Sequence, residues 1–150
     1  MFTSVRYFIK TSFAFFILGM LSGLYIYAAG VFGWPMPFNL IQAHTHVLLM
    51  GGMFMMILGV ATWFFPRPTK DDKKYNPEVI RAGYWIFTFS TLFRFVAEVF
   101  QGFYPRGLAD SFGFWSACLQ IMAAVAIIYS IWGRIRPTGS KLREERGEKF

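Results

Sequence analysis

The sequence predicts an all-α, polytopic membrane protein: a bundle of four transmembrane helices with both termini in the cytoplasm. Three observations predict this class: four long apolar runs, few charged residues and an uneven distribution of Lys and Arg. Of the 150 residues, 55% are hydrophobic and 15% are charged, whereas soluble domains carry about 25% charged residues. The single cysteine, Cys118, excludes an intramolecular disulfide framework and a zinc site of clustered cysteines.

Each apolar run has roughly the 20 residues that a helix needs to cross the bilayer core. The runs and the tail that follows them cover residues 7–29, 40–65, 82–103, 112–133 and, as a cytoplasmic tail, 134–150. Because the runs and their short connections account for nearly the whole chain, we expect one domain over residues 1–150.

The first run can also be read as a secretory signal peptide, because basic residues precede and open it. Its apolar part is longer than the usual length of about 7 to 15 residues, and Tyr27 before Ala28 and Ala29 makes a poor cleavage site. We therefore expect a retained membrane helix. The spacing of Gly19 and Gly23 on this helix lets another helix approach closely.

The basic residues indicate the orientation. Of the 15 lysines and arginines, 13 lie on the side that includes both termini, Arg106 lies on the other side and Arg94 lies within a span. By the positive-inside rule, both termini are cytoplasmic. The net charge of +7 is then a topology signal, and the recognition module that nucleic-acid binding would need is not visible. We expect an integral protein of a bacterial or archaeal cytoplasmic membrane.

Polar side chains within the spans gather in the outer half of the bilayer. At about 1.5 Å per residue, Arg94 and Glu98 lie about 13 Å and about 7 Å below the outer end of the third span. His44 and His46 lie at similar depths in the second span. Polar groups at such depths are costly and therefore point to function. Arg94 and Glu98, four residues apart, can neutralise each other; alternatively, Arg94 meets an anion such as a haem propionate.

His44 and His46 are the candidate ligands. Positions two apart on a helix differ by about 200°, so the two imidazoles point to opposite faces and can each bind a different group. Neutral imidazole suits haem iron, copper or zinc. The absence of a Cys-x-x-Cys-His motif excludes covalent c-type haem. Met50 and the nearby methionines are possible copper ligands, although their spacing is more typical of residues that fill apolar gaps.

A resemblance to a known family rests on the second apolar run, AHTHVLLMGGMFMMILGVATWFFPR. This run resembles the tenth helix of subunit I of the haem–copper oxidases and nitric oxide reductases. The family pattern is Ala-His-x-His, then a small-residue patch, then an aromatic-Pro ending, here Ala43, His44, His46, Gly51, Gly52, Phe65 and Pro66. The segment GYWIFTFSTLF is similar to the next helix of the family, and residues 104–106 are similar to a loop that supplies arginines to haem propionates.

The resemblance implies that His44 and His46 are axial ligands to the iron of two different haem b groups. It also implies that Arg106, with Arg94 as the second candidate, contacts haem propionates. The chain departs from the family in having four predicted spans where the family subunit has twelve. It also lacks the histidines of the family's copper or non-haem iron centre, so it is not expected to be an enzyme by itself.

Three functions stay open at this stage. The first, which we favour, is a small haem b cytochrome for electron transfer, with a quinol or a cytochrome as the candidate redox partner. The second is a minimal nitric oxide or oxygen reductase completed by another subunit. The third is a non-haem subunit of a respiratory complex that handles copper or has a structural role. The family's twelve helices form three arcs of four, so the resemblance implies a homotrimer in preference to a homodimer. Each haem would then lie between chains, with His44 from one chain and His46 from the next.

Overall fold

The computed structural model describes residues 3–65, 75–103, 107–135 and 147, and every regular element in these ranges is helical. The elements are α1 (Thr3–Phe32), α2 (Leu40–His46), the π-helix η1 (Val47–Phe54), α3 (Met55–Phe64), α4 (Pro77–Phe103), α5 (Leu108–Ile131) and the 3-10 turn η2 (Trp132–Arg134). The predicted all-α class is confirmed. The helices extend a few residues beyond most of the predicted apolar runs, because a helix does not stop where its apolar core stops.

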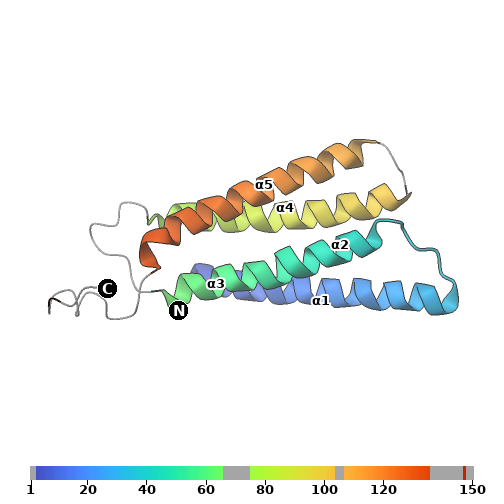
Figure 1. The fold of residues 1–150 in the computed structure, drawn as a ribbon, viewed down its shortest axis with the longest axis horizontal. Helices are drawn as coiled ribbons and strands as arrows, with labels where there is room; N and C mark the ends of the chain where they lie inside the picture. Colours follow the sequence, from blue (N-terminus) through green and yellow to red (C-terminus); the bar gives the residue numbers. More distant parts are fainter. Residues whose placement is uncertain (1–2, 66–74, 104–106, 136–146, 148–150) are drawn as a thin grey trace.

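The helices form two antiparallel pairs (Figure 1). The elements α2, η1 and α3 follow one another without a break and form one continuous rod, which packs along α1. Helices α4 and α5 form the second pair, and contacts between α2 and α4 join the two pairs. The beginning of α1, the end of α3, the beginning of α4 and the end of α5 lie at one end of the molecule.

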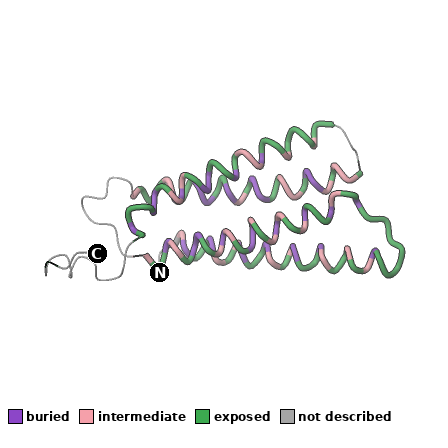
Figure 2. Tube along the Cα trace, viewed as in Figure 1, coloured by how far each residue is buried: buried purple, intermediate pink, exposed green. Residues whose placement is uncertain are grey.

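Within the described ranges, three helical segments are long and apolar enough to cross a membrane. They are Ser4–Phe32, Leu40–Phe64 and Leu108–Arg134. Helix α4, which corresponds to the third predicted span, has 27 residues but carries Glu78, Arg81, Arg94 and Glu98, and it is not among them. Many large apolar residues are exposed, as expected of a protein surrounded by lipid, and Figure 2 shows the exposed residues distributed over both pairs of helices. A membrane protein is therefore well supported, whereas the four-span topology stays a prediction.

Local sequence signals account for two of the helix ends. Gly33, directly after α1, has a positive φ of 68°, the left-handed conformation in which many helices end and which glycine adopts without strain. At the start of α4, the Asn76 side chain accepts a hydrogen bond of 2.9 Å from the backbone N–H of Glu78, as N-terminal capping residues do.

Glycines bring α1 and the continuous rod of α2, η1 and α3 into close contact. A Cβ atom on Gly51 would lie 2.7 Å from Cγ of Phe15, and one on Gly52 would lie 2.7 Å from the ring of Phe16. Both glycines belong to η1, which begins directly after His46. A π-helix is rare and is usually found as a single turn next to a functional site. The eight residues of η1 were not predicted from the sequence.

Candidate functional site

His46, the last residue of α2, faces α4 through both ring nitrogens. Its Nδ1 lies 2.7 Å from Oε1 of Glu98, and its Nε2 lies 2.9 Å from Nη2 of Arg94. A carboxylate only accepts hydrogen bonds and a guanidinium only donates them. The Nδ1–H group therefore donates to Glu98, and Nε2 accepts a hydrogen bond from Arg94. This is the bonding pattern of a neutral imidazole.

Arg94, whose side chain is 19% exposed, is the centre of a partly buried polar network that joins three helices. Its Nε donates to Oε1 of Glu98 over 3.0 Å, and its Nη1 donates to Oε1 of Gln120 on α5 over 3.2 Å. Gln120 in turn donates from Nε2 to the hydroxyl of Thr91 over 2.7 Å. The ion pair that the four-residue spacing of Arg94 and Glu98 allows is present; a contact of Arg94 with an anion stays a prediction. Each nitrogen of this guanidinium makes one hydrogen bond within the described residues, which leaves one N–H on each Nη for a further acceptor.

The Glu98 carboxylate is only partly satisfied. Oε1 accepts hydrogen bonds from both His46 and Arg94, whereas Oε2 is buried without a partner in the part of the chain that the structure describes. The residue is 4% exposed. Because a buried, unpaired acceptor costs free energy, this oxygen is a position at which a further donor would be stabilising.

His44 lies on the opposite face of α2, against α1. Its Nδ1 lies 2.8 Å from the carbonyl oxygen of Gly19 and 3.3 Å from the hydroxyl of Ser22. A Cβ atom on Gly23 would come within 2.7 Å of the ring carbon Cε1. A carbonyl can only accept, so Nδ1 carries the proton and Nε2 carries the lone pair. Within the described ranges, Nε2 of His44 has no hydrogen-bond partner.

Of the predicted site residues that the structure describes, it brings Arg94 and His46 together and places His44 apart from them. His44 and His46 point to opposite sides of α2, as the helical geometry predicted, and Arg94 lies beside His46 only. Arg106 lies outside the described residues, so its predicted contact with a propionate stays a prediction. Met50 packs against the hydrophobic core, which supports its interpretation as a residue that fills an apolar gap.

The donor groups do not form a metal site of protein ligands alone. Nowhere in the described ranges do three His, Cys, Asp or Glu side chains gather. Axial ligation of haem needs only one imidazole on each side of the iron, because the macrocycle supplies the other four donors. One imidazole on each side is the donor set that His44 and His46 of two chains could offer.

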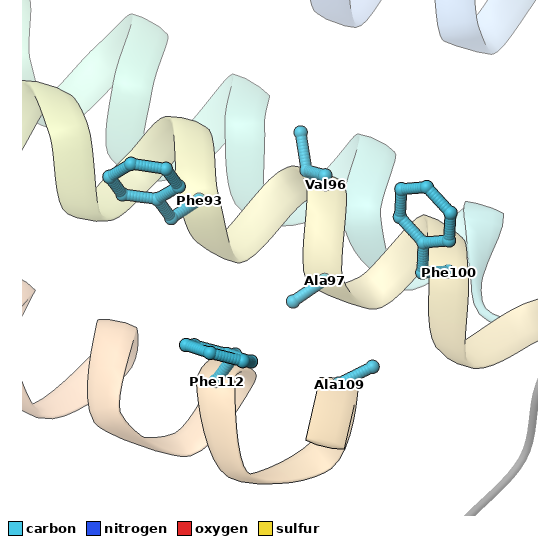
Figure 3. Close-up of a pocket in the computed structure, with 6 residues that line it drawn as sticks. All are labelled: Phe93, Val96, Ala97, Phe100, Ala109 and Phe112. Atoms are coloured by element: carbon cyan, nitrogen blue, oxygen red, sulfur yellow. The ribbon is translucent and has the colours of Figure 1, made fainter. Parts of the chain in front are cut away.

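Two apolar grooves lie elsewhere on the surface. One, of about 420 Å³, lies between α4 and α5, with the side chains of Phe93, Phe100 and Phe112 along it (Figure 3). The other, of about 390 Å³, lies between α1 and α4 and includes Ser22. Neither groove is lined by His44 or His46. Neither, therefore, provides a haem pocket with a ligand from its own chain.

Sequence reasoning identified the histidines but did not identify their partners. The sequence did indicate that another helix approaches α1 closely, because Gly19 and Gly23 are four residues apart. It did not indicate that His44 would lie at this contact. Gln120, the hydrogen-bond partner of Arg94, is a polar residue within the fourth apolar run.

A comparison of the chain with models of protein families, with curated proteins and with solved structures gives no match. The resemblance to the haem–copper oxidase and nitric oxide reductase family thus stays a hypothesis that rests on the His44 helix.

Proposed function

We propose that the chain is a membrane cytochrome that binds haem b and transfers electrons in a bacterial or archaeal cytoplasmic membrane. The observation that supports this best is the anchoring of both imidazoles through Nδ1. Histidines that bind a metal almost always donate their other ring N–H to a carbonyl or a carboxylate, which fixes the tautomer and the ring orientation. His44 has the carbonyl of Gly19 in this position, and His46 has the carboxylate of Glu98.

Both histidines therefore present Nε2, unprotonated, as the remaining ligand atom. His44 is the readier of the two, because its Nε2 has no competing partner in the described residues. Nε2 of His46 accepts a hydrogen bond from Arg94 and would become available only when Arg94 moves. When bound, the haem would supply one-electron chemistry at its iron. The chain would supply the ligands, their orientation and an environment of low polarity.

The opposite orientation of the two imidazoles supports binding between chains. One helix cannot place His44 and His46 on the same iron, so a six-coordinate haem needs His44 from one chain and His46 from another. We propose a homotrimer with one haem per chain, and a homodimer is the alternative. His46 faces α4 of its own chain, so a haem bound there would have to enter between α2 and α4.

An absorption spectrum of the detergent-purified protein tests the proposed function. We expect a reduced-minus-oxidised spectrum of a low-spin b-type haem, and His44→Gln should remove most of it. Gln42→Ala, which changes an exposed residue of the same helix, is the matched control and should leave the spectrum intact. A protein that folds and contains no haem, or a spectrum that His44→Gln does not change, would overturn the proposal.

A further inference from the structure

The guanidinium of Arg94 is hydrogen-bonded to Nε2 of His46, the atom through which His46 would bind a haem iron. Nη2 of Arg94 lies 2.9 Å from Nε2 of His46. Since Nδ1 of the same ring is held by Glu98, Nε2 is the only ligand atom that His46 has left. In this arrangement Arg94 and the iron compete for one lone pair.

A second acceptor for Nη2 lies on Glu98, the carboxylate that Nε of Arg94 already contacts. Nε of Arg94 already donates to Oε1 of Glu98 over 3.0 Å, and Oε2 of that carboxylate is buried without a partner in the described part of the chain. Nε and Nη2 lie on one edge of the guanidinium and match the two oxygens of a carboxylate in a two-bond fork. A rotation that takes Nη2 from His46 to Oε2 would therefore complete this fork.

The two arrangements differ little in the number of groups left unpaired. In the observed one, Oε2 of Glu98 lacks a donor; in the other, Nε2 of His46 loses one. If a haem iron takes the lone pair of His46 at the same time, both groups are satisfied. Gln120 and Thr91 hold the opposite side of the network, so Arg94 can change partners without leaving it.

We infer that Arg94 is a positioning residue. In the haem-free chain its Nη2 hydrogen bond blocks the lone pair of His46 Nε2, and the transfer of this hydrogen bond to Glu98 makes that lone pair available. This inference rests on the proposed function. His44 would then be the residue at which haem binds first, and His46 would become available as a ligand only after Arg94 has moved. The ion pair of Arg94 and Glu98 persists throughout, which keeps both charges paired inside the membrane.

The haem-free protein tests the first half of the inference. In a His44→Gln chain labelled with ¹⁵N-histidine, only His46 contributes ring signals. We expect the Nε2 signal of an unprotonated nitrogen that accepts a hydrogen bond, and we expect Arg94→Lys to move it downfield, toward a free lone pair. The lysine side chain ends one bond short of Nη2, and its ammonium group is drawn to the carboxylate. Arg81→Lys, which changes the exposed partner of Glu78, is the matched control and should leave the signal in place.

An Nε2 signal that is already that of a free lone pair in the chain with Arg94 would overturn the inference. This measurement needs no substitution at position 94, so it stands even if Arg94→Lys does not fold.

Haem binding to the chain with both histidines tests the second half. If Arg94 leaves Nε2 of His46 available in only a fraction of the chains, the apparent affinity of His46 for haem falls by that fraction. The step in which His46 binds becomes slower for the same reason. We expect a five-coordinate spectrum that converts slowly to a six-coordinate one, and Arg94→Lys should accelerate this conversion by about tenfold, equivalent to about 1.4 kcal/mol.

Equal conversion rates in the two chains would overturn the role of Arg94 and leave the proposed function standing. A failure of both chains to bind haem would overturn the proposed function, and the inference with it.

Discussion

The carbonyl oxygen of Gly19 accepts a hydrogen bond of 2.8 Å from Nδ1 of His44, so the backbone of α1 orients an imidazole on α2. A backbone carbonyl within a helix is normally covered by its own side chains and by the next turn. Here Gly23 leaves the helix surface uncovered, and the His44 ring lies directly against it, whereas a Cβ atom on Gly19 would meet Leu48. The orientation of the candidate ligand therefore depends on the absence of a side chain at Gly23.

Gly23→Ala should disturb this arrangement, because the new Cβ atom would lie 2.7 Å from Cε1 of His44. We expect the ring to shift and the apparent haem affinity to fall by about tenfold, the lower limit of what losing an orienting partner costs a metal site. Haem titration followed by absorbance measures this. Gly30→Ala is the control, since a Cβ atom there would meet nothing within 4 Å. Equal affinities in the two variants would show that α1 does not position His44.

Glu98→Gln should strongly destabilise the chain. It leaves the cationic Arg94 without its carboxylate in an environment where Glu98 is 4% exposed, and breaking a buried ion pair costs about 3 to 5 kcal/mol. The control is Glu78→Gln. Glu78 also pairs with an arginine, Arg81, but at the surface, where an ion pair contributes about 0 to 1 kcal/mol. Unfolding in detergent compares the two free energies. A loss of similar size in both variants would mean that water reaches Glu98.

Most of the fold follows from patterns within single segments. The four apolar runs predicted helices at nearly their observed positions, because length and hydrophobicity act locally. The opposite orientation of His44 and His46 follows from the helical step, and the pairing of Arg94 with Glu98 follows from their spacing. None of these predictions needed to know which helices are neighbours.

The parts that sequence reasoning did not predict depend on contacts between helices. The hydrogen bond from Arg94 to His46 requires a particular register between α2 and α4, which no local pattern specifies. The π-helix η1 is a second example. Its adjacent glycines, Gly51 and Gly52, leave space for a neighbouring group. Which side chains fill that space, Phe15 and Phe16, and how closely they approach depends on the packing of α1 against η1. Tertiary packing, rather than local preference, set these features.

The connection between α1 and α2 should face the outside of the membrane. Trp34 lies in this connection and is 50% exposed, and the sequence between Gly30 and Asn39 carries no charge. In a Cys118→Ala background, we expect Trp34→Cys to react with a membrane-impermeant thiol reagent added to intact cells. A cysteine at the exposed Arg81, near the beginning of α4, should react only after the membrane is opened. The reverse pattern would contradict the orientation derived from the basic residues.

Native mass spectrometry in detergent should find three chains with three haem groups. The two ligand atoms of one chain lie on opposite sides of α2: His44 contacts α1, and His46 contacts α4. A closed cyclic assembly satisfies every such pair, because each chain gives His44 to one neighbour and His46 to the other. A twofold dimer can use all four histidines only if it holds two haems at equivalent sites, so its haem number would equal its chain number as well. The number of chains therefore separates these two assemblies, and the haem count tests whether every ligand is used.

His46→Gln should yield chains with haem bound through His44 alone and a five-coordinate spectrum, whereas Thr45→Ser, between the two histidines, should leave the assembly unchanged. A six-coordinate haem on a single chain would contradict the model, because one helix cannot direct both imidazoles at one iron.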